Sequence, residues 1–122
     1  MSLSRRKRIL LFLAYALIIT VLSLLPAEQS PALNIWDKLE HFCAYLLFMM
    51  LAFPLGHNHR WRLASAAGIV AYSIAVEYAQ QLSPGRHTSI EDVFANSLGV
   101  ISGYLMAWLI MHFAMRKRRA LG

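Results

Sequence analysis

The feature that most constrains this chain is an uncharged apolar run from Ile9 to Leu25, which directly follows the basic run Arg5-Arg6-Lys7-Arg8. At about 1.5 Å per residue, a helix of this length comes near the roughly 30 Å hydrocarbon core of a bilayer. A signal peptide also has a basic start, but its apolar region is usually only about 7–15 residues long. We therefore favour a first transmembrane helix, with cleavage after Ala27 as the alternative.

The composition of the whole chain agrees with a membrane location. Its 122 residues are 58% hydrophobic and 15% charged, and their mean hydropathy is +0.49, which is too apolar for an ordinary soluble domain. The formal charge of +6 comes mainly from short basic runs at the ends of apolar segments, a pattern that orients membrane proteins rather than one that binds nucleic acid. We expect a single membrane domain over residues 1–122, with membrane lipids and no nucleic acid as partners.

Polar connectors divide the chain into apolar segments. Pro26 and Pro31 lie in the first connector, and Pro54 follows the second segment. The stretch from His57 to Arg62 is interpreted as a wet connector with an interfacial tryptophan, and Ser83-Pro84-Gly85 ends the third segment. We expect an all-α polytopic bundle of four transmembrane helices, at about 9–25, 35–53, 63–82 and 89–115.

Basic residues are unevenly distributed between the two sides that four spans would create. On the side of the termini and the middle connector lie Arg5, Arg6, Lys7, Arg8, Arg60, Arg62, Arg116, Lys117, Arg118 and Arg119. Only Lys38 and Arg86 lie on the other side, so the positive-inside rule places both termini in the cytoplasm. The acids lie in or near the external half: Glu28, Asp37, Glu40, Glu77, Glu91 and Asp92.

The same topology brings polar residues from three segments to the external face. They are Asp37, Lys38, Glu40, His41, Glu77, Gln80, Gln81, Arg86, Ser89, Asp92 and Asn96. An ionisable side chain is costly in a bilayer and usually faces a bundle interior or a wet cavity, so it indicates a functional site by default. Asp37 and His41 are four residues apart and share a helical face. This face continues through Ala44, Tyr45 and Phe48, so we expect a polar pocket at the outer boundary of the membrane.

One stripe of the fourth segment combines polar residues with glycines. Asp92, Asn96, Gly99 and Gly103 recur at intervals of four, three and four residues. A G-x-x-x-G spacing lets transmembrane helices approach closely. We therefore expect Gly99 and Gly103 to pack within the bundle or against a second copy in a homo-oligomer. In the third segment one face recurs every four residues, with small residues nearby, which favours close packing against a neighbouring helix. The face is Ser65, Ile69, Ser73 and Glu77, and the small residues are Ala66 and Gly68.

These residues together resemble the VanZ-like family of bacterial integral membrane proteins. The resemblance lies in Ser23-Leu24-Leu25-Pro26, in Asp37-Lys38-x-x-His41, in Glu77-x-x-Gln80 followed by Pro84-Gly85-Arg86, and in Ser89-x-x-Asp92-x-x-x-Asn96-x-x-Gly99-x-x-x-Gly103. It covers most of the chain and leaves the basic tails outside. It implies a multi-span protein of the bacterial plasma (inner) membrane, related to one associated with teicoplanin resistance, but it implies no established reaction.

Residue chemistry suggests roles within the external site. Acids and a histidine are the groups that general acid–base catalysis uses, so the candidate catalytic residues are Glu77, Asp92, His41 and Asp37. Cations, amides and the N-terminus of the fourth helix can hold an anionic or polar head group, so the candidate substrate-binding residues are Arg86, Lys38, Gln80, Ser89 and Asn96. This pattern suggests phosphoryl transfer, glycosyl transfer or hydrolysis on a lipid phosphate or a lipid-linked precursor.

Other features weaken a catalytic interpretation. Glu91 and Asp92 in the first turn of the fourth helix would repel an anion, and the chain contains neither an H-E-x-x-H motif nor a nucleophile elbow. One histidine among dispersed acids is a weak metal signal, and the single Cys43 excludes a Cys-based metal site. We therefore expect no metal and no other cofactor.

The same residues also have structural interpretations. Asp37 and Asp92 can stabilise helix N-termini, and Gln80 and Asn96 can form interhelical hydrogen bonds. We favour an N-cap role for Ser89 and a functional role for Glu77, His41 and Arg86. Whether the protein is an enzyme stays open, because a non-catalytic amphiphile binder, a transporter and a helper subunit are alternatives.

Overall fold

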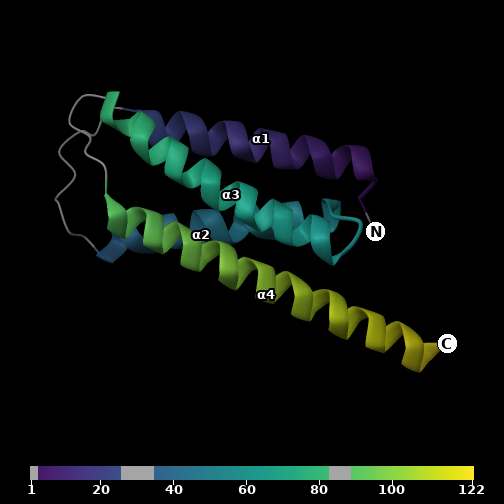
Figure 1. The fold of residues 1–122 in the computed structure, drawn as a ribbon. Coiled ribbons are helices and arrows are strands. Elements are labelled where there is room, and N and C mark those ends of the chain that lie inside the picture. Colours follow the sequence, from purple (N-terminus) through teal and green to yellow (C-terminus); the bar gives the residue numbers. More distant parts are fainter. Residues whose placement is uncertain (1–2, 26–34, 83–88) are drawn as a thin grey trace.

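The computed structural model describes residues 3–25, 35–82 and 89–122, and this part of the chain is all-helical. Its elements are α1 (Arg5–Leu24), α2 (Ile35–Ala52), α3 (His59–Ala79) and α4 (Ile90–Leu121), with short 3-10 helices η1 (Phe53–Leu55) and η2 (Gln80–Leu82). Successive long helices run in opposite directions (Figure 1). The first and last described residues therefore lie at one end of the bundle, the terminal end, and the starts of α2 and α4 lie at the other, the polar end.

The four predicted helical segments are all present, but two of them begin earlier than predicted. Ser4 caps α1, because its Oγ accepts a hydrogen bond from the Lys7 backbone N–H at 3.4 Å. Asn58 caps α3 in the same way, through the Trp61 backbone N–H at 3.1 Å. The interpretation of residues 57–62 as a connector is therefore wrong for 59–62, which form the first turn of α3.

The other end of the chain is also more helical than predicted. The fourth helix continues past residue 115 to Leu121 and includes the basic run Arg116–Arg119. Arginine, lysine and alanine are good helix formers, and no proline or glycine interrupts them before Gly122. As a result α4 extends beyond the other helices at the terminal end (Figure 1).

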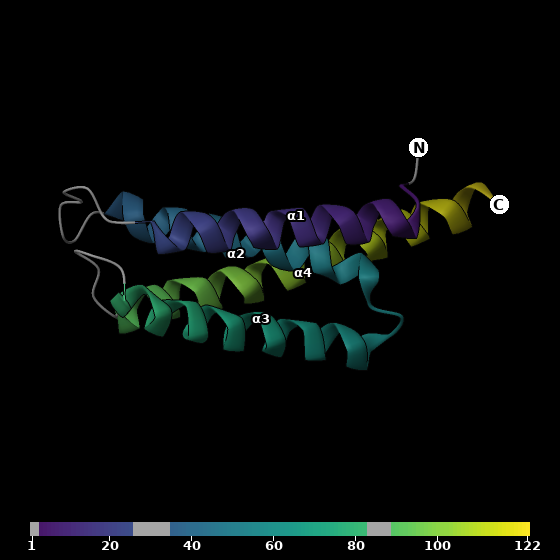
Figure 2. The same ribbon diagram turned by 90° about the horizontal axis from the view of Figure 1, so that it is seen from above.

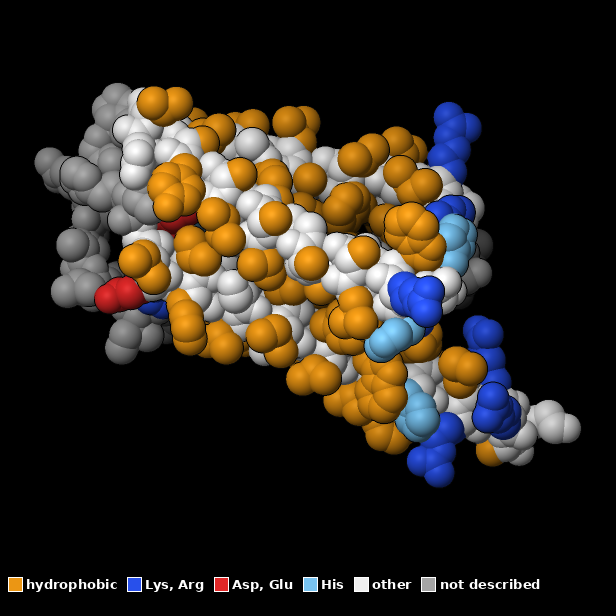
Figure 3. All heavy atoms as spheres, viewed as in Figure 1, with side chains coloured by type: hydrophobic (Ala, Val, Ile, Leu, Met, Phe, Trp, Pro, Cys, Tyr) orange, Lys and Arg blue, Asp and Glu red, His pale blue; other side chains and the backbone are white. Residues whose placement is uncertain are grey.

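Three described helices are long and apolar enough to cross a membrane. They are Arg5–Leu24, Asp37–Leu55 and Ile90–Leu121. The helix α1 buries only Ile19 and exposes leucines on most of its surface, and apolar side chains cover much of the face shown in Figure 3. Such a surface is compatible with lipid rather than with water.

The closest helix pair is α2 with α4, which share the most extensive contact in the bundle. A Cβ atom at Gly99 would collide with the Phe42 carbonyl oxygen and lie 3.1 Å from the Leu46 backbone nitrogen. A Cβ at Gly103 would collide with the Leu46 carbonyl oxygen. The two glycines therefore bring the backbones of α2 and α4 into contact, as the spacing predicted. On α3 the face predicted to pack closely is buried at Ile69, Ser73 and Glu77, whereas Gly68 itself has nothing within 4 Å of its Cβ position.

Phe48 is at the centre of the core formed by α1, α2 and α3. Its ring lies 5.2 Å from Phe12, 5.6 Å from Tyr15 and 5.6 Å from Tyr72, measured between ring centroids. The tilted and edge-on arrangements of these rings are those that aromatic pairs prefer. Beside this cluster, Met49 is 0% exposed, so the middle of the bundle is closely packed.

Polar side chains within the bundle bond to neighbouring helices. The Tyr15 hydroxyl donates to the Ala44 carbonyl oxygen at 2.6 Å, and the hydroxyls of Thr20 and Tyr72 are hydrogen-bonded to each other. Among the described residues, every buried side-chain polar atom has a partner. A protein in lipid must pair its buried polar atoms internally in this way, because lipid chains offer no hydrogen-bond partners.

The glycine contact leads to a first prediction. Gly99→Ala and Gly103→Ala should each lower the free energy of unfolding by about 1–3 kcal/mol, because a methyl group would press against the backbone of α2. Gly68→Ala is the matched control: it meets open space and should be neutral or stabilising by up to about 1 kcal/mol through helix propensity. Thermal unfolding in one mild detergent measures all three. Equal stability of the Gly99→Ala and Gly68→Ala proteins would contradict the close approach.

Candidate functional site

The polar end gathers charged side chains from the beginnings of two helices. The Lys38 ammonium is paired with Asp92 and also lies 3.6 Å from Asp37 Oδ2 and 4.0 Å from Glu91 Oε2. One cation therefore interacts with carboxylates of both α2 and α4. This arrangement offsets the repulsion among these acids and ties the first turns of the two helices together.

His41 lies beside this ion-pair cluster and connects it to Asn96. Its Nδ1 is 3.1 Å from Asn96 Oδ1, and because a carboxamide oxygen only accepts, Nδ1 carries the hydrogen in this contact. Its Nε2 faces two carboxylates, at 3.6 Å from Asp92 Oδ2 and 3.9 Å from Asp37 Oδ1. The imidazole is thus oriented through one nitrogen, and its other nitrogen is directed at acids, an arrangement suited to proton transfer.

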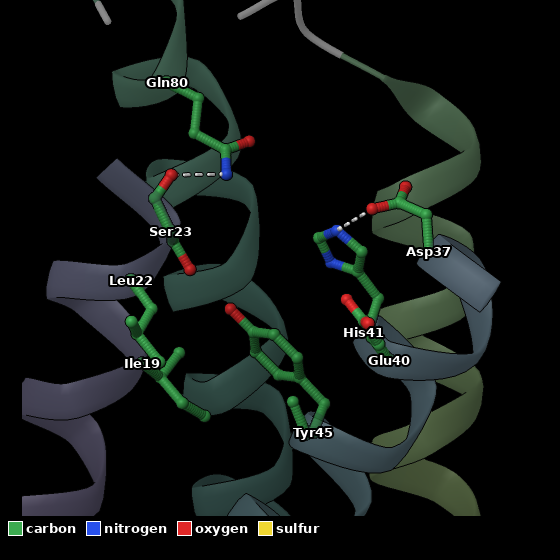
Figure 4. Close-up of a pocket in the computed structure, with 9 residues that line it drawn as sticks. Ile19, Leu22, Ser23, Asp37, Glu40, His41, Tyr45 and Gln80 are labelled. Carbon is green, nitrogen blue, oxygen red and sulfur yellow. Dashed lines mark hydrogen bonds and ion pairs between the residues drawn. The ribbon is translucent and has the colours of Figure 1, made fainter. Parts of the chain in front are cut away.

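A pocket of about 300 Å³ opens next to His41. It is lined by Ile19, Leu22 and Ser23 of α1, by Asp37, Glu40, His41, Ala44 and Tyr45 of α2, and by Gln80 of η2. Figure 4 shows His41 and Tyr45 extending from α2 toward the space between α1 and α2. One wall is therefore polar and the facing wall on α1 is mainly apolar, which makes the pocket amphipathic.

Gln80 joins α3 to α1 at the edge of this pocket. Its Nε2 donates to the Ser23 carbonyl oxygen at 2.8 Å (Figure 4), and the side chain is 3% exposed. This bond satisfies a carbonyl in the last turn of α1, where helix carbonyls lose their internal partners. Gln80 therefore has the interhelical role that was one of its two predicted interpretations, and it also forms part of the pocket wall.

Glu77 lies deeper than the pocket and has a different partner. It is 2% exposed, and its Oε1 accepts a hydrogen bond from the Ser89 backbone N–H at 2.7 Å. Its carboxylate also interacts electrostatically with Lys38, His41 and Asp92. Ser89 in turn caps α4, since its Oγ accepts from the Asp92 backbone N–H at 3.2 Å, which confirms the predicted N-cap. Glu77 thus joins the end of α3 to the start of α4.

Asp37, His41 and Asp92 are the residues most suited to hold a metal ion. Each offers a ligand atom, and these atoms lie within 4.8 Å of one another. However, the Lys38 ammonium already bonds to Asp92 and lies next to Asp37. A divalent cation in this position would have to displace or repel that ammonium, so the cluster has its own cation.

The structure brings most of the predicted site residues together. Asp37, Lys38, His41, Asp92 and Asn96 form one cluster of contacts, and Glu77, Gln80 and Ser89 adjoin it. Arg86 lies outside the described residues. Gly99 and Gly103 lie farther along α4 and pack against α2. That any of these residues is catalytic or binds substrate stays a prediction.

Sequence reasoning missed the contribution of α1 to the pocket. Ile19 and Leu22 form its apolar wall, and Ser23 contributes its backbone carbonyl oxygen. Apolar residues in an apolar helix carry no distinguishing signal. The only available indication was positional, because the end of α1 and the start of α2 must lie at the same end of an antiparallel bundle.

The fold and this cluster define a class: a small helical membrane protein with ionisable groups gathered at one end of its bundle. The VanZ/LLP1 family model matches residues 9–111, most of the chain. The chain therefore belongs to the VanZ/LLP1 family, which confirms the resemblance seen in its motifs. No curated protein and no solved structure matches it.

The contact between Glu77 and Ser89 leads to a second prediction. Glu77→Ala should lower the free energy of unfolding by about 3 kcal/mol, because it leaves a cavity and an unpaired, partly buried N–H group. Glu77→Gln should retain most of the stability, since its carboxamide oxygen can still accept that hydrogen bond. Thermal unfolding in a mild detergent compares the two, with the exposed Glu91→Ala as a neutral control. A Gln variant as unstable as the Ala variant would assign the effect to the charge instead.

Proposed function

We propose that this protein binds the polar head group of a lipid-linked envelope precursor in the pocket beside His41. The observation that carries the proposal is the amphipathic lining of that pocket, which sets acids and amides opposite the lipid-facing helix α1. A volume of about 300 Å³ is at the low end for ligand sites. It therefore suits a head group, while the lipid chain would lie along the exposed leucines of α1.

The polar lining favours a ligand that donates hydrogen bonds. Asp37, Glu40 and the carbonyl oxygen of the Gln80 side chain are acceptors. Lys38, the nearest cation, is already paired with Asp92. A sugar with hydroxyl and amide N–H groups would complement these acceptors better than a bare phosphate. The diphosphate of a lipid-linked sugar would then lie outside the acidic wall, towards the membrane surface.

Handling of such a precursor is consistent with the family. Membership in VanZ/LLP1 makes an altered tolerance to glycopeptides such as teicoplanin a candidate consequence of this binding. We place the protein in the bacterial plasma (inner) membrane, with the polar end external. A homo-oligomer or a helper complex formed through Gly99 and Gly103 has less support, because α2 already covers both glycines.

An enzymatic role is the second candidate function. It is favoured by one observation: His41 is oriented by Asn96, lines the pocket, and directs its other nitrogen at Asp37 and Asp92. In this alternative Nε2 of His41 would exchange a proton with the bound head group, while Asn96 holds the imidazole through Nδ1. Its substrates would be a lipid phosphate or a lipid-linked head group.

Glu40 offers the cleanest test of the binding proposal. It lines the pocket, is exposed, and has no hydrogen bond or ion pair within the described part of the chain. Glu40→Gln should weaken binding of a polyprenyl-diphosphate-linked N-acetyl sugar about tenfold, because a charge-assisted hydrogen bond is lost. Glu91→Gln is the matched control, since Glu91 lies at the same end but outside the pocket. Affinity is measured with purified protein in detergent, with sugar-free polyprenyl phosphate for comparison.

The outcomes of this experiment separate the alternatives. Equal binding of the sugar-free lipid would contradict a sugar site and favour the lipid-phosphate alternative. Release of a cleaved head group by the wild type, lost in His41→Gln while binding survives, would establish an enzyme. Wild-type protein that binds neither lipid would contradict the proposal as a whole.

The topology behind this proposal is itself testable. We propose that α3 crosses the membrane as well, because its 21 residues reach about 30 Å and it lies alongside the other helices over its length (Figure 2). In a Cys43→Ala background, cysteines at Ser4, Asn58 and Leu121 should react with a membrane-impermeant thiol reagent only after the cells are opened. A cysteine at Glu91 should react in intact cells. Labelling of Asn58→Cys in intact cells would contradict a spanning α3.

A further inference from the structure

A second pocket lies at the terminal end, far along the helices from the acidic cluster. It has a volume of about 350 Å³ and is lined by Arg8, Met50, Phe53, Pro54, Arg62, Ala107, Ile110 and Met111. These residues come from α1, α2, η1, α3 and α4, so every long helix contributes to it. Apart from the two arginines the lining is apolar, and its methionines are flexible side chains that adapt to irregular ligands.

The two arginines give this pocket a positively charged rim. Arg62 is held in place, because its Nε donates to the Phe53 carbonyl oxygen at 3.3 Å and its guanidinium lies 4.5 Å from the centre of the Phe53 ring. Its terminal nitrogens have no hydrogen-bond partner within the described residues. Arg8 is half-buried, and its side chain makes no hydrogen bond or ion pair within them either. Both guanidiniums therefore have N–H donors that could bind a ligand.

No described carboxylate balances these charges. The described acids are Asp37, Glu40, Glu77, Glu91 and Asp92, and all of them lie at the polar end. On the face shown in Figure 3, Lys and Arg side chains gather at the terminal end and acidic ones appear at the opposite end. Where lipid rather than water fills this pocket, a guanidinium without an acid is costly unless an anion completes the site.

We propose that this pocket binds one anionic phospholipid, with its phosphate between Arg8 and Arg62 and an acyl chain against Phe53, Ala107 and Ile110. Guanidinium groups recognise phosphate through paired N–H donors, and basic pockets between transmembrane helices are a known setting for anionic head groups. The apolar lining distinguishes this ligand from free phosphate, which it could not bury. The positive rim distinguishes it from a zwitterionic lipid, whose own cation would face two arginines.

The lipid would join α1 to α4, two helices that otherwise contact each other little. The end of α4 extends past the other helices (Figure 1), and the pocket is lined by Ile110 and Met111 of α4 together with Arg8 of α1. A lipid in this position would bridge α1, α3 and α4. It would therefore stabilise the folded protein in proportion to its occupancy. This site is independent of the proposed sugar pocket at the polar end.

The test measures lipid binding to the full chain purified in a neutral detergent. Phosphatidylglycerol should bind with one tight site by native mass spectrometry and raise the unfolding temperature, whereas phosphatidylcholine with the same acyl chains and sn-glycerol 3-phosphate alone should not. Arg8→Gln should weaken phosphatidylglycerol binding about tenfold, because it removes a charge-assisted contact. Arg62→Lys, which keeps the charge but loses the paired donors, should weaken it as well.

Lys7→Gln is the matched control. Lys7 precedes Arg8 on α1 and carries the same charge, but it is exposed and does not line the pocket. Its substitution should leave the tight site unchanged. Equal losses in Lys7→Gln and Arg8→Gln would overturn the proposal in favour of diffuse surface attraction. Equal binding of phosphatidylcholine would overturn it in favour of a non-selective apolar groove, and binding of glycerol phosphate alone would show that no acyl chain is needed.

Discussion

The contact between the glycine face of α4 and the backbone of α2 is the constraint on which the rest of this structure depends. Gly99 and Gly103 leave no room for a side chain between the two helices. The helix faces that meet at these glycines continue to the polar end, where Lys38 pairs with Asp92 and His41 contacts Asn96. Side chains three and four residues apart share a helical face. The contact of Gly99 and Gly103 with α2, here called the glycine seam, and the polar cluster are therefore two parts of one α2–α4 interface. A shift of α4 along α2 would misplace both.

The distribution of charge gives the two ends of the bundle different physical characters. At the polar end one ammonium lies among three acids, so part of the negative charge is compensated within the chain and an acidic excess remains. At the terminal end the basic residues have no described acid nearby. In a medium of low dielectric constant, compensated charges can be built into the fold, whereas uncompensated ones require a counter-ion from outside. In the proposed lipid site, an anionic lipid of the membrane supplies that counter-ion at the terminal end.

The sequence was sufficient for the features that depend on periodicity and local chemistry. Apolar run lengths predicted the four helices, the spacing of Gly99 and Gly103 predicted the seam, and Ser89 was identified as an N-cap. It was not sufficient where a partner is a distant backbone atom or an ordinary apolar side chain. Glu77 bonds to the backbone N–H group of Ser89, a partner that no residue type encodes, and Ile19 is one aliphatic residue among many. The start of α3 was missed for another reason: Asn58 is a favoured N-cap type, but the arginines and the tryptophan after it also fit an interfacial connector.

The polar residues at the polar end differ in how fully their atoms are hydrogen-bonded within the chain, and this difference bears on which of them can bind a ligand. Glu77 and Asn96 are each 2% exposed and have partners within the chain, so their removal acts first on the fold. Glu40 and His41 line the pocket and retain atoms that face it. A binding or catalytic group must exchange partners with a ligand, which a buried and fully bonded group cannot do without loss of the fold. In the proposed function, the ligand therefore contacts the α2 face that borders α1, and the α3–α4 junction supports that face.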